Sequence, residues 1–287
     1  MNKHDLALWG CGKIGQATGK IIRQKNLELK WVYDKNIAKA AIFQRNYEQG
    51  ELLHKPPDAA SFPKVKTVID ASGDENLLAY WTKVLQFKRV KHIILTRREP
   101  RADNHYMAGL YSQKPFFKKG SITSMGSCTG NCLIPLISHL ETSFAPAAIS
   151  CRILHPLKQD KIFTLRNIKT ALKLSLQDHL PHLTDIFIGQ SMELPTKRGM
   201  ALDLAINFKN PVKKNELTDF FENLSDNYEF FHKSRQSVDS DLVINRPESA
   251  ILDINWKFTN NHFRGLIWQD NEYGFSSRIY DLMQYLE

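Results

Sequence analysis

The sequence predicts an α/β protein in which a doubly wound parallel sheet is followed by an α+β domain with a mostly antiparallel sheet. Between residues 6 and 95, apolar strand-like runs alternate with helical patterns, the order typical of parallel strands joined by crossover helices. A GxGxxG pattern follows the first of these runs and precedes the first helical pattern. Beyond residue 148, strand-like segments follow one another with fewer helices between them, which favours antiparallel pairing.

The composition is that of a globular chain, with 42% hydrophobic and 24% charged residues among 287. The net charge of +9 favours anionic partners, and nucleotides, phosphorylated metabolites, nucleic acid and a plain solvated surface all remain open. Because we find no RNA- or DNA-binding motif, nucleic acid is the least favoured of these alternatives.

The cysteines and the apolar runs indicate the compartment. The four cysteines are scattered without the CxxC spacing of a zinc or redox site, so we expect a reducing compartment and no metal. No apolar stretch approaches about 18 residues, and the N-terminal apolar run is too short for a signal segment. These features predict a cytoplasmic protein without a membrane span.

The N-terminal segment has the order strand, glycine turn, helix, strand and acidic residue. An apolar run at 6–9 leads into GCGKIG at 10–15, a helical pattern at 14–23 and an alternating run at 27–33. Asp34 follows, 19 residues after Gly15, close to the interval of about 20 in dinucleotide-binding Rossmann-type folds. An acidic residue there favours NAD over NADP because it repels a 2′-phosphate, although Lys35 beside it leaves NADP open. The cofactor-binding residues that this pattern predicts are Gly10, Gly12, Lys13, Ile14, Gly15 and Asp34.

The next elements extend the parallel sheet. Residues 36–64 are helical and then irregular, 65–71 form a strand, 75–87 a helix and 90–95 another strand. Ligands bind at the carboxyl ends of such strands. The residues that fall there are Gly10, Asp34, Ser72 and Thr96.

Cys128 lies where a short strand at 121–124 gives way to an apolar helical run. A thiol in the first turn of a helix faces free backbone N–H groups, which favour the thiolate, the nucleophilic form. Taken alone, the cysteine is better interpreted as a small residue that fills the turn than as a nucleophile.

Further elements are expected as a strand at 148–154 ending at His155, a strand at 200–208, a helix at 216–224, adjacent strands at 250–258 and 262–268, and a helix at 279–286.

Three motifs, in order along the chain, resemble those of the glyceraldehyde-3-phosphate dehydrogenase family. GCGKIGQ at 10–16 resembles the family's GFGRIGR, SCTGNC at 127–132 resembles SCTTNC, and WQDNEYGFS at 268–276 resembles WYDNEWGYS. The resemblance implies that Cys128 is the nucleophile and that His155, 27 residues later, is its base. It also implies that NAD is the cofactor, that Asn271 holds the nicotinamide carboxamide and that Thr96 lines the cofactor site.

The resemblance further implies a glycolytic oxidoreductase with two domains. Residues 1–127 and 269–287 would form the NAD-binding domain, onto which the C-terminal helix packs back, and residues 128–268 the catalytic domain.

The chain departs from the family on the side that binds phosphate. Gly130 replaces a threonine, Glu193 replaces an arginine that binds phosphate in the family, and the segment around 166–173 is shortened. An acidic Glu193 would repel phosphate. The remaining candidates for substrate contacts are Ser127, Thr129, Lys158, Thr170 and Arg198.

Three functional hypotheses follow. The first is NAD-dependent oxidation of glyceraldehyde 3-phosphate or a related aldehyde through a Cys128 thiohemiacetal and thioester, with inorganic phosphate as acyl acceptor. The second keeps the chemistry but takes a non-phosphorylated aldehyde and water as acceptor. The third is a non-catalytic NAD-binding or regulatory paralogue. A homo-oligomer is compatible with all three.

Overall fold

The computed structural model describes residues 5–110, 117–156, 165–166, 171–194, 196 and 198–286. The chain divides into two compact units. Unit 1 comprises the described residues of Met1–Met107, Gln113–Gly126 and Ser276–Glu287, and unit 2 those of Ala108–Ser112 and Ser127–Phe275. None of the helices in the described part of the chain is long and apolar enough to cross a membrane.

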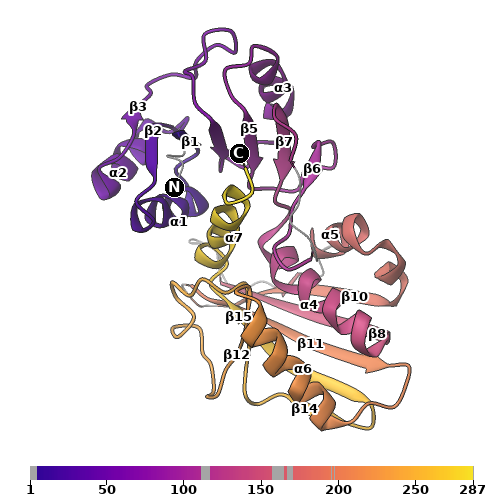
Figure 1. Ribbon diagram of the computed structural model, residues 1–287. Helices are drawn as coiled ribbons and strands as arrows, with labels where there is room; N and C mark the ends of the chain where they lie inside the picture. The colour runs from indigo at the N-terminus through magenta and orange to yellow at the C-terminus, as the bar shows by residue number, and fades with distance from the viewer. Residues whose placement is uncertain are drawn as a thin grey trace. The chain divides into compact units, whose positions relative to one another are not determined.

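Unit 1 is built on a sheet of seven described strands in the order β3-β2-β1-β4-β5-β7-β6, and every described pairing in it is parallel (Figure 1). Its strands are β1 (Asp5–Trp9), β2 (Glu28–Tyr33), β3 (Glu51–Leu52), β4 (Thr67–Asp70), β5 (His92–Leu95), β6 (Asn104–His105) and β7 (Ser121–Ser124). Its helices are α1 (Lys13–Gln24), α2 (Ile37–Tyr47), the 3-10 helix η1 (Glu75–Leu77), α3 (Leu78–Gln86) and most of α7 (Tyr273–Met283).

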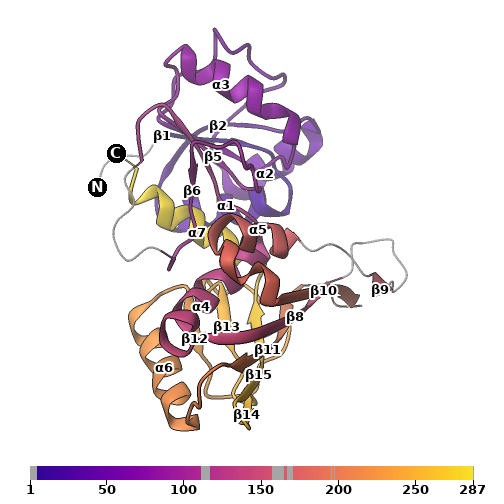
Figure 2. The same cartoon turned by 90° about the vertical axis from the view of Figure 1, so that its right-hand side faces the viewer.

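Helices cover both faces of this sheet, with α3 on one and α1, α2 and α7 on the other (Figure 2). Strands β4 and β5 are therefore buried along their whole length, as is usual for central parallel strands. The apolar side of α1, including Ile21 and Ile22, is buried. The later turns of α7 pack on α1, where the Thr18 hydroxyl donates to Ser276 Oγ at 3.2 Å.

Unit 2 is built on a mixed sheet in the order β12-β13-β15-β11-β8-β10-β9, with β14 also paired to β15. The β8/β10 and β12/β13 pairs are parallel and the other described pairs are antiparallel. Figure 1 shows α4 and α6 on the same face of this sheet. The strands are β8 (Pro146–Pro156), β9 (Leu165–Arg166), β10 (Phe187–Leu194), β11 (Met200–Phe208), β12 (Phe231–Lys233), β13 (Ala250–Leu252), β14 (Lys257–Thr259) and β15 (His262–Gln269). The helices are α4 (Cys128–Phe144), α5 (Ala171–His179), the 3-10 helix η2 (Pro181–Ile186) and α6 (Lys214–Asn227).

The predicted fold class is confirmed, but several elements differ from expectation. The strand expected at 250–258 is two strands, because the Asp253 carboxylate accepts from the backbone N–H groups of Asn255 at 2.7 Å and Val238 at 2.9 Å and stabilises a turn. Helix α7 begins at Tyr273, six residues before the expected 279, because Asp270 Oδ1 accepts from Tyr273 N at 3.0 Å. His155 lies within β8 and not beyond its end. The sequence patterns did not indicate α5 and β10.

Candidate functional site

The glycine turn between β1 and α1 depends on a different property of each glycine. Gly10 has φ +103°, and a Cβ there would lie 2.5 Å from the backbone of Ala71 and Ser72. A Cβ on Gly15 would lie 2.1 Å from Gly10 O. Gly12 has nothing within 4 Å of its Cβ position. Gly10 and Gly15 therefore permit the close packing of the turn, whereas Gly12 leaves open space through which a ligand can approach the backbone at the start of α1.

Asp34 joins the end of β2 to this turn. Its Oδ2 accepts from Cys11 N at 2.7 Å and its Oδ1 from Asn36 N at 2.8 Å. The carboxylate is half-buried. Each oxygen retains a further lone pair, so the carboxylate can still accept hydrogen bonds from ribose hydroxyls.

A cavity of about 470 Å³ opens at the carboxyl ends of β1, β2 and β4. Between β1 and β4 the strand order reverses, which is the position where doubly wound sheets bind ligands. The volume of this cavity suits a nucleoside-sized ligand. The cavity is lined by Trp9, Gly10, Gly12, Tyr33, Asp34, Lys35, Lys39, Pro56, Pro57, Asp58, Ala71, Ser72, Asp74, Leu77 and Tyr80.

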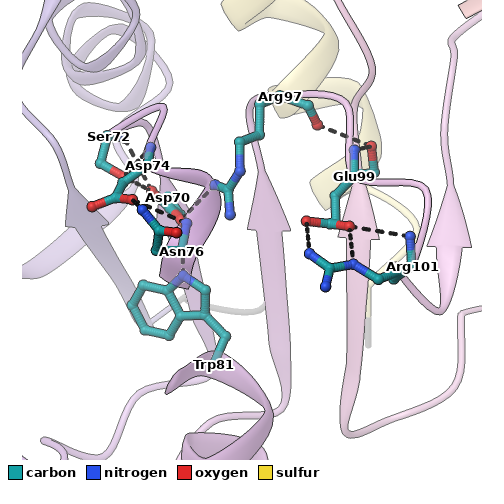
Figure 3. A network of polar contacts seen from close by, with 9 residues as sticks. Asp70, Ser72, Asp74, Asn76, Trp81, Arg97, Glu99 and Arg101 are labelled. Atoms are coloured by element: carbon teal, nitrogen blue, oxygen red, sulfur yellow. Dashed lines mark hydrogen bonds and ion pairs between the residues drawn. The ribbon is translucent and has the colours of Figure 1, made fainter. Parts of the chain in front are cut away.

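The wall at the end of β4 is held by the fully buried Asp70 (Figure 3). Its Oδ1 accepts from the Ser72 hydroxyl at 2.6 Å and from Ser72 N at 3.0 Å. Its Oδ2 accepts from Trp81 Nε1 and from Arg97 Nη1, each at 2.8 Å. One carboxylate thus connects β4 to α3 and to Arg97, which follows β5, and it fixes Ser72 at the cavity.

The open space at Gly12 leads to a prediction about ligand binding. If the turn holds NAD, as the sequence pattern predicts, Gly12→Val should weaken NAD binding at least about tenfold by calorimetry, because the side chain would occupy the approach to the helix start. The melting temperature should change little, since the residue has φ −70° and ψ −164° and meets no neighbour. Gly15→Ala is the contrasting variant and should melt well below the wild type. Unchanged NAD affinity in Gly12→Val would contradict the assignment.

In unit 2, Cys128 is the first residue of α4. Ser127 caps the helix, and its Oγ accepts from Gly130 N at 3.0 Å. The same hydroxyl lies 3.2 Å from Thr129 Oγ1 and 3.2 Å from Ser175 Oγ on α5. Because the cap uses Gly130 N, the backbone N–H groups of Cys128 and Thr129 remain for the sulfur or for an oxyanion formed beside it.

The expectation that this position favours the thiolate holds only in part. Burial raises the pKa of the Cys128 thiol to about 11, the Glu272 carboxylate also acts to raise it, and the backbone N–H groups of Thr129 and Cys128 act in the opposite direction. The side chain keeps partial solvent access. In the ligand-free protein the thiol therefore keeps its proton at neutral pH, and a reaction at the sulfur would require a base.

The raised pKa predicts an alkaline labelling profile for Cys128. Since only the thiolate alkylates, the iodoacetamide rate at Cys128 should rise about tenfold per pH unit from roughly pH 7 to 10. Peptide mass spectrometry would measure it, with glutathione as a free-thiol reference that levels off earlier. A Cys128 rate that reaches its plateau near pH 8 would show that the sulfur is activated in the resting protein.

The position of His155 relative to Cys128 follows from the helix and strand that carry them. Burial, and then the neighbouring thiols of Cys151 and Cys128, raise the pKa of Cys132 well above its ordinary value, so Cys132 on α4 lies close to Cys151 on β8. Strand β8 follows α4 after one residue and runs back along it. From this neighbouring pair of thiols, Cys128 is one turn toward the start of α4, and His155 is two same-face positions toward the end of β8. Both residues are therefore displaced in the same direction.

The loop before α7 contributes a buried amide and two carboxylates. Asn271 Oδ1 is buried and has no hydrogen-bond partner among the described residues. Its neighbour Asp270 is fully buried, and its Oδ2 accepts from Asn245 N at 2.8 Å and Arg198 Nη2 at 3.1 Å. An unpartnered amide oxygen of this kind suits the NH₂ group of a carboxamide.

The other predicted residues are distributed as follows. Lys13 is exposed and Ile14 is half-buried in the first turn of α1. Thr96 is half-buried and follows β5, and its backbone N–H donates a hydrogen bond to Asp70 O at 3.0 Å. Lys158 and Thr170 lie outside the described residues. Asp70, Arg97 and Glu272 were not predicted. Asp70 is an acidic residue near the end of an expected strand and Glu272 lies within the motif at 268–276, so both could have been singled out, whereas Arg97 was only one charge of a polar loop.

The family model of the glyceraldehyde 3-phosphate dehydrogenase C-terminal domain matches residues 127–271, about half of the chain. The match begins at Ser127, the cap of the cysteine helix, and ends at Asn271, whose amide oxygen is buried and unpartnered among the described residues. With this match in unit 2 and a parallel, doubly wound sheet bearing a glycine turn in unit 1, the chain belongs to the glyceraldehyde 3-phosphate dehydrogenase family.

Proposed function

We propose that the protein oxidises an aldehyde with NAD through a covalent intermediate on Cys128, and that glyceraldehyde 3-phosphate or a related aldehyde is the substrate. The observation that carries the proposal is the position of Cys128 at the capped start of α4, with its own N–H and that of Thr129 directed at the sulfur.

The chemistry of the chain's own residues begins with the thiol. The Cys128 sulfur bonds to the aldehyde carbon while its proton passes to His155, and the imidazolium then gives that proton to the carbonyl oxygen, which becomes the hydroxyl of a thiohemiacetal. Backbone N–H groups at the start of α4 stabilise the negative charge that develops on that oxygen during attack. His155 then serves as the base for the hydroxyl proton as the carbon is oxidised to a thioester. Inorganic phosphate cleaves the thioester to an acyl phosphate and restores the thiol.

NAD supplies the two-electron acceptor for this oxidation. The residues that would hold it are the glycine turn, whose open Gly12 admits a pyrophosphate, Asp34, which accepts from the adenosine ribose, and Asn271, whose buried amide oxygen suits the carboxamide. Thr96, after β5, is the further candidate for the cofactor site. Lys35 and Lys39 line the same cavity as Asp34, so NADP belongs in the same binding assay.

A second candidate function is oxidation of a non-phosphorylated aldehyde with water as the acceptor. Glu193 favours it, because a carboxylate next to the position of His155 would repel a phosphate group. A third, the non-catalytic paralogue, predicts NAD binding without turnover.

One experiment separates the three candidates. Purified protein would be assayed for NADH formation with a panel of phosphorylated and plain aldehydes, with NAD or NADP, across a range of phosphate concentrations, while calorimetry records cofactor binding. A rate that rises with phosphate supports the first candidate, and a rate independent of phosphate supports the second. Cofactor binding without hydride transfer from any aldehyde would reject both.

A further inference from the structure

Strands β8 and β10 place Glu193 directly beside His155. The two strands pair in parallel over eight residues, from Phe187 opposite Ile149 to Leu194 opposite Pro156 (Figure 2). Within that register, Glu193 is the partner of His155. Residues paired in this way in neighbouring strands have side chains close enough to interact.

The alternation of burial places both side chains on the same face. In β8, Ile149, Cys151 and Ile153 are buried and the intervening residues Ser150 and Arg152 are exposed, so the alternation places the half-buried His155 on the same face as the buried set. In β10, the residues paired with that set are Phe187, Gly189, Ser191 and Glu193. Cys132 of α4 lies near Cys151, whose side chain is on this face, so the face is also that of the cysteine helix.

The carboxylate of Glu193 has unused hydrogen-bonding capacity. Its Oε2 is buried and has no hydrogen-bond partner among the described residues. A buried acceptor without a partner carries a desolvation cost, which falls when a donor reaches it. An imidazole N–H of the neighbouring histidine is a donor of the right kind, and its imidazolium form also balances the charge.

We propose that Glu193 is a positioning residue for His155, whose carboxylate fixes the orientation of the imidazole and stabilises the imidazolium that forms when the Cys128 thiol loses its proton. The inference rests on the proposed function, since it assigns a role relative to that reaction. The arrangement is the cysteine, histidine and third polar group of other thiol enzymes, built here on two paired strands and a helix start. The proposal thus assigns a role in the reaction to Glu193, the residue that replaces the family's phosphate-binding arginine in the sequence comparison.

Other ionisable groups surround this pair. Cys128 and Cys132 come from α4, Cys151 from β8, and Glu272 from the loop before α7. Helix α5, which packs on β10, carries Lys173 and Asp178 at exposed positions and His179 at a half-buried one, and Arg166 on β9 pairs in register with Ser191. Among these described ionisable residues, Glu193 is the one paired in register with His155 itself.

The test is an NMR titration of His155 in the full chain, with the signal assigned by its loss in His155→Gln. In the wild type the His155 pKa should lie above the ordinary value of about 6.5, and in Glu193→Gln it should fall by about one unit, because a neighbouring negative charge favours the imidazolium. Glu193→Asp keeps the charge and should retain most of the shift. Glu229→Gln, which removes an exposed carboxylate in the same unit, is the matched control and should leave His155 unchanged.

Kinetics give the second readout. Glu193→Gln should lower kcat about 10- to 100-fold with little change in KM, and the acidic limb of the pH profile should move to lower pH. A His155 pKa that is the same in the wild type and in Glu193→Gln would overturn the inference whether or not the protein turns over. Because the titration needs no substrate, a shifted His155 pKa in a protein that oxidises no aldehyde would support the placement of Glu193 and reject the proposed function instead.

Discussion

Cys128→Ser should abolish aldehyde-dependent NADH formation, lowering kcat by at least about 10⁴-fold. A serine hydroxyl at the start of α4 would still accept from the backbone N–H groups, but it is a far weaker nucleophile than a thiolate. The variant leaves the glycine turn, Asp34 and Asn271 unaltered, so the calorimetric affinity for NAD should be unchanged. Loss of turnover with intact cofactor binding would locate the defect at the chemical step.

The matched control for this variant is Cys132→Ala. Cys132 lies one helical turn beyond Cys128, is fully buried, and faces Cys151 instead of solvent. Its removal should lower thermal stability modestly while leaving kcat within about threefold of the wild type. Equal losses of activity in the two variants would mean that the helix start, and not the Cys128 sulfur, is what the reaction requires.

The sequence was sufficient for the features that depend on neighbouring residues. The glycine turn and Asp34 follow a strand at a fixed interval, and the backbone constraints at Gly10 and Gly15 are those that the pattern encodes. The start of α4 was likewise predictable, because a short strand at 121–124 gives way to an apolar helical run. These predictions needed no knowledge of distant segments.

The features that the sequence did not reveal depend on distant pairings. Strand β10, with the sequence FIGQSMEL, lacks a regular apolar alternation, and its place beside β8 is fixed by a parallel register between Glu193 and His155, 38 residues apart. The sign of the Cys128 pKa shift is a similar case. The helix start lowers the pKa as expected, but burial by residues from elsewhere in the unit raises it by more.

Asp70→Asn should strongly destabilise unit 1. The side chain keeps its shape but loses its charge, and it presents an NH₂ group to donors that now meet a carboxylate. The Arg97 side chain, only 10% exposed, would lose its ion-pair partner at 2.8 Å. Removing one partner of a buried pair costs about 3–5 kcal/mol, because the remaining charge stays desolvated.

The measurement is urea unfolding followed by tryptophan fluorescence, since Trp81 itself donates to Asp70 and reports on this part of unit 1. Glu28→Gln is the control, because the Lys30–Glu28 pair in the same unit is 43% and 45% exposed and its loss should not measurably change the transition. NAD affinity should also fall in Asp70→Asn, as the same carboxylate holds Ser72 at the cavity through two hydrogen bonds. If Asp70→Asn unfolded at the wild-type urea concentration, the buried ion pair would be dispensable for the fold. Reduced NAD affinity in that case would assign Asp70 to shaping the cofactor cavity alone.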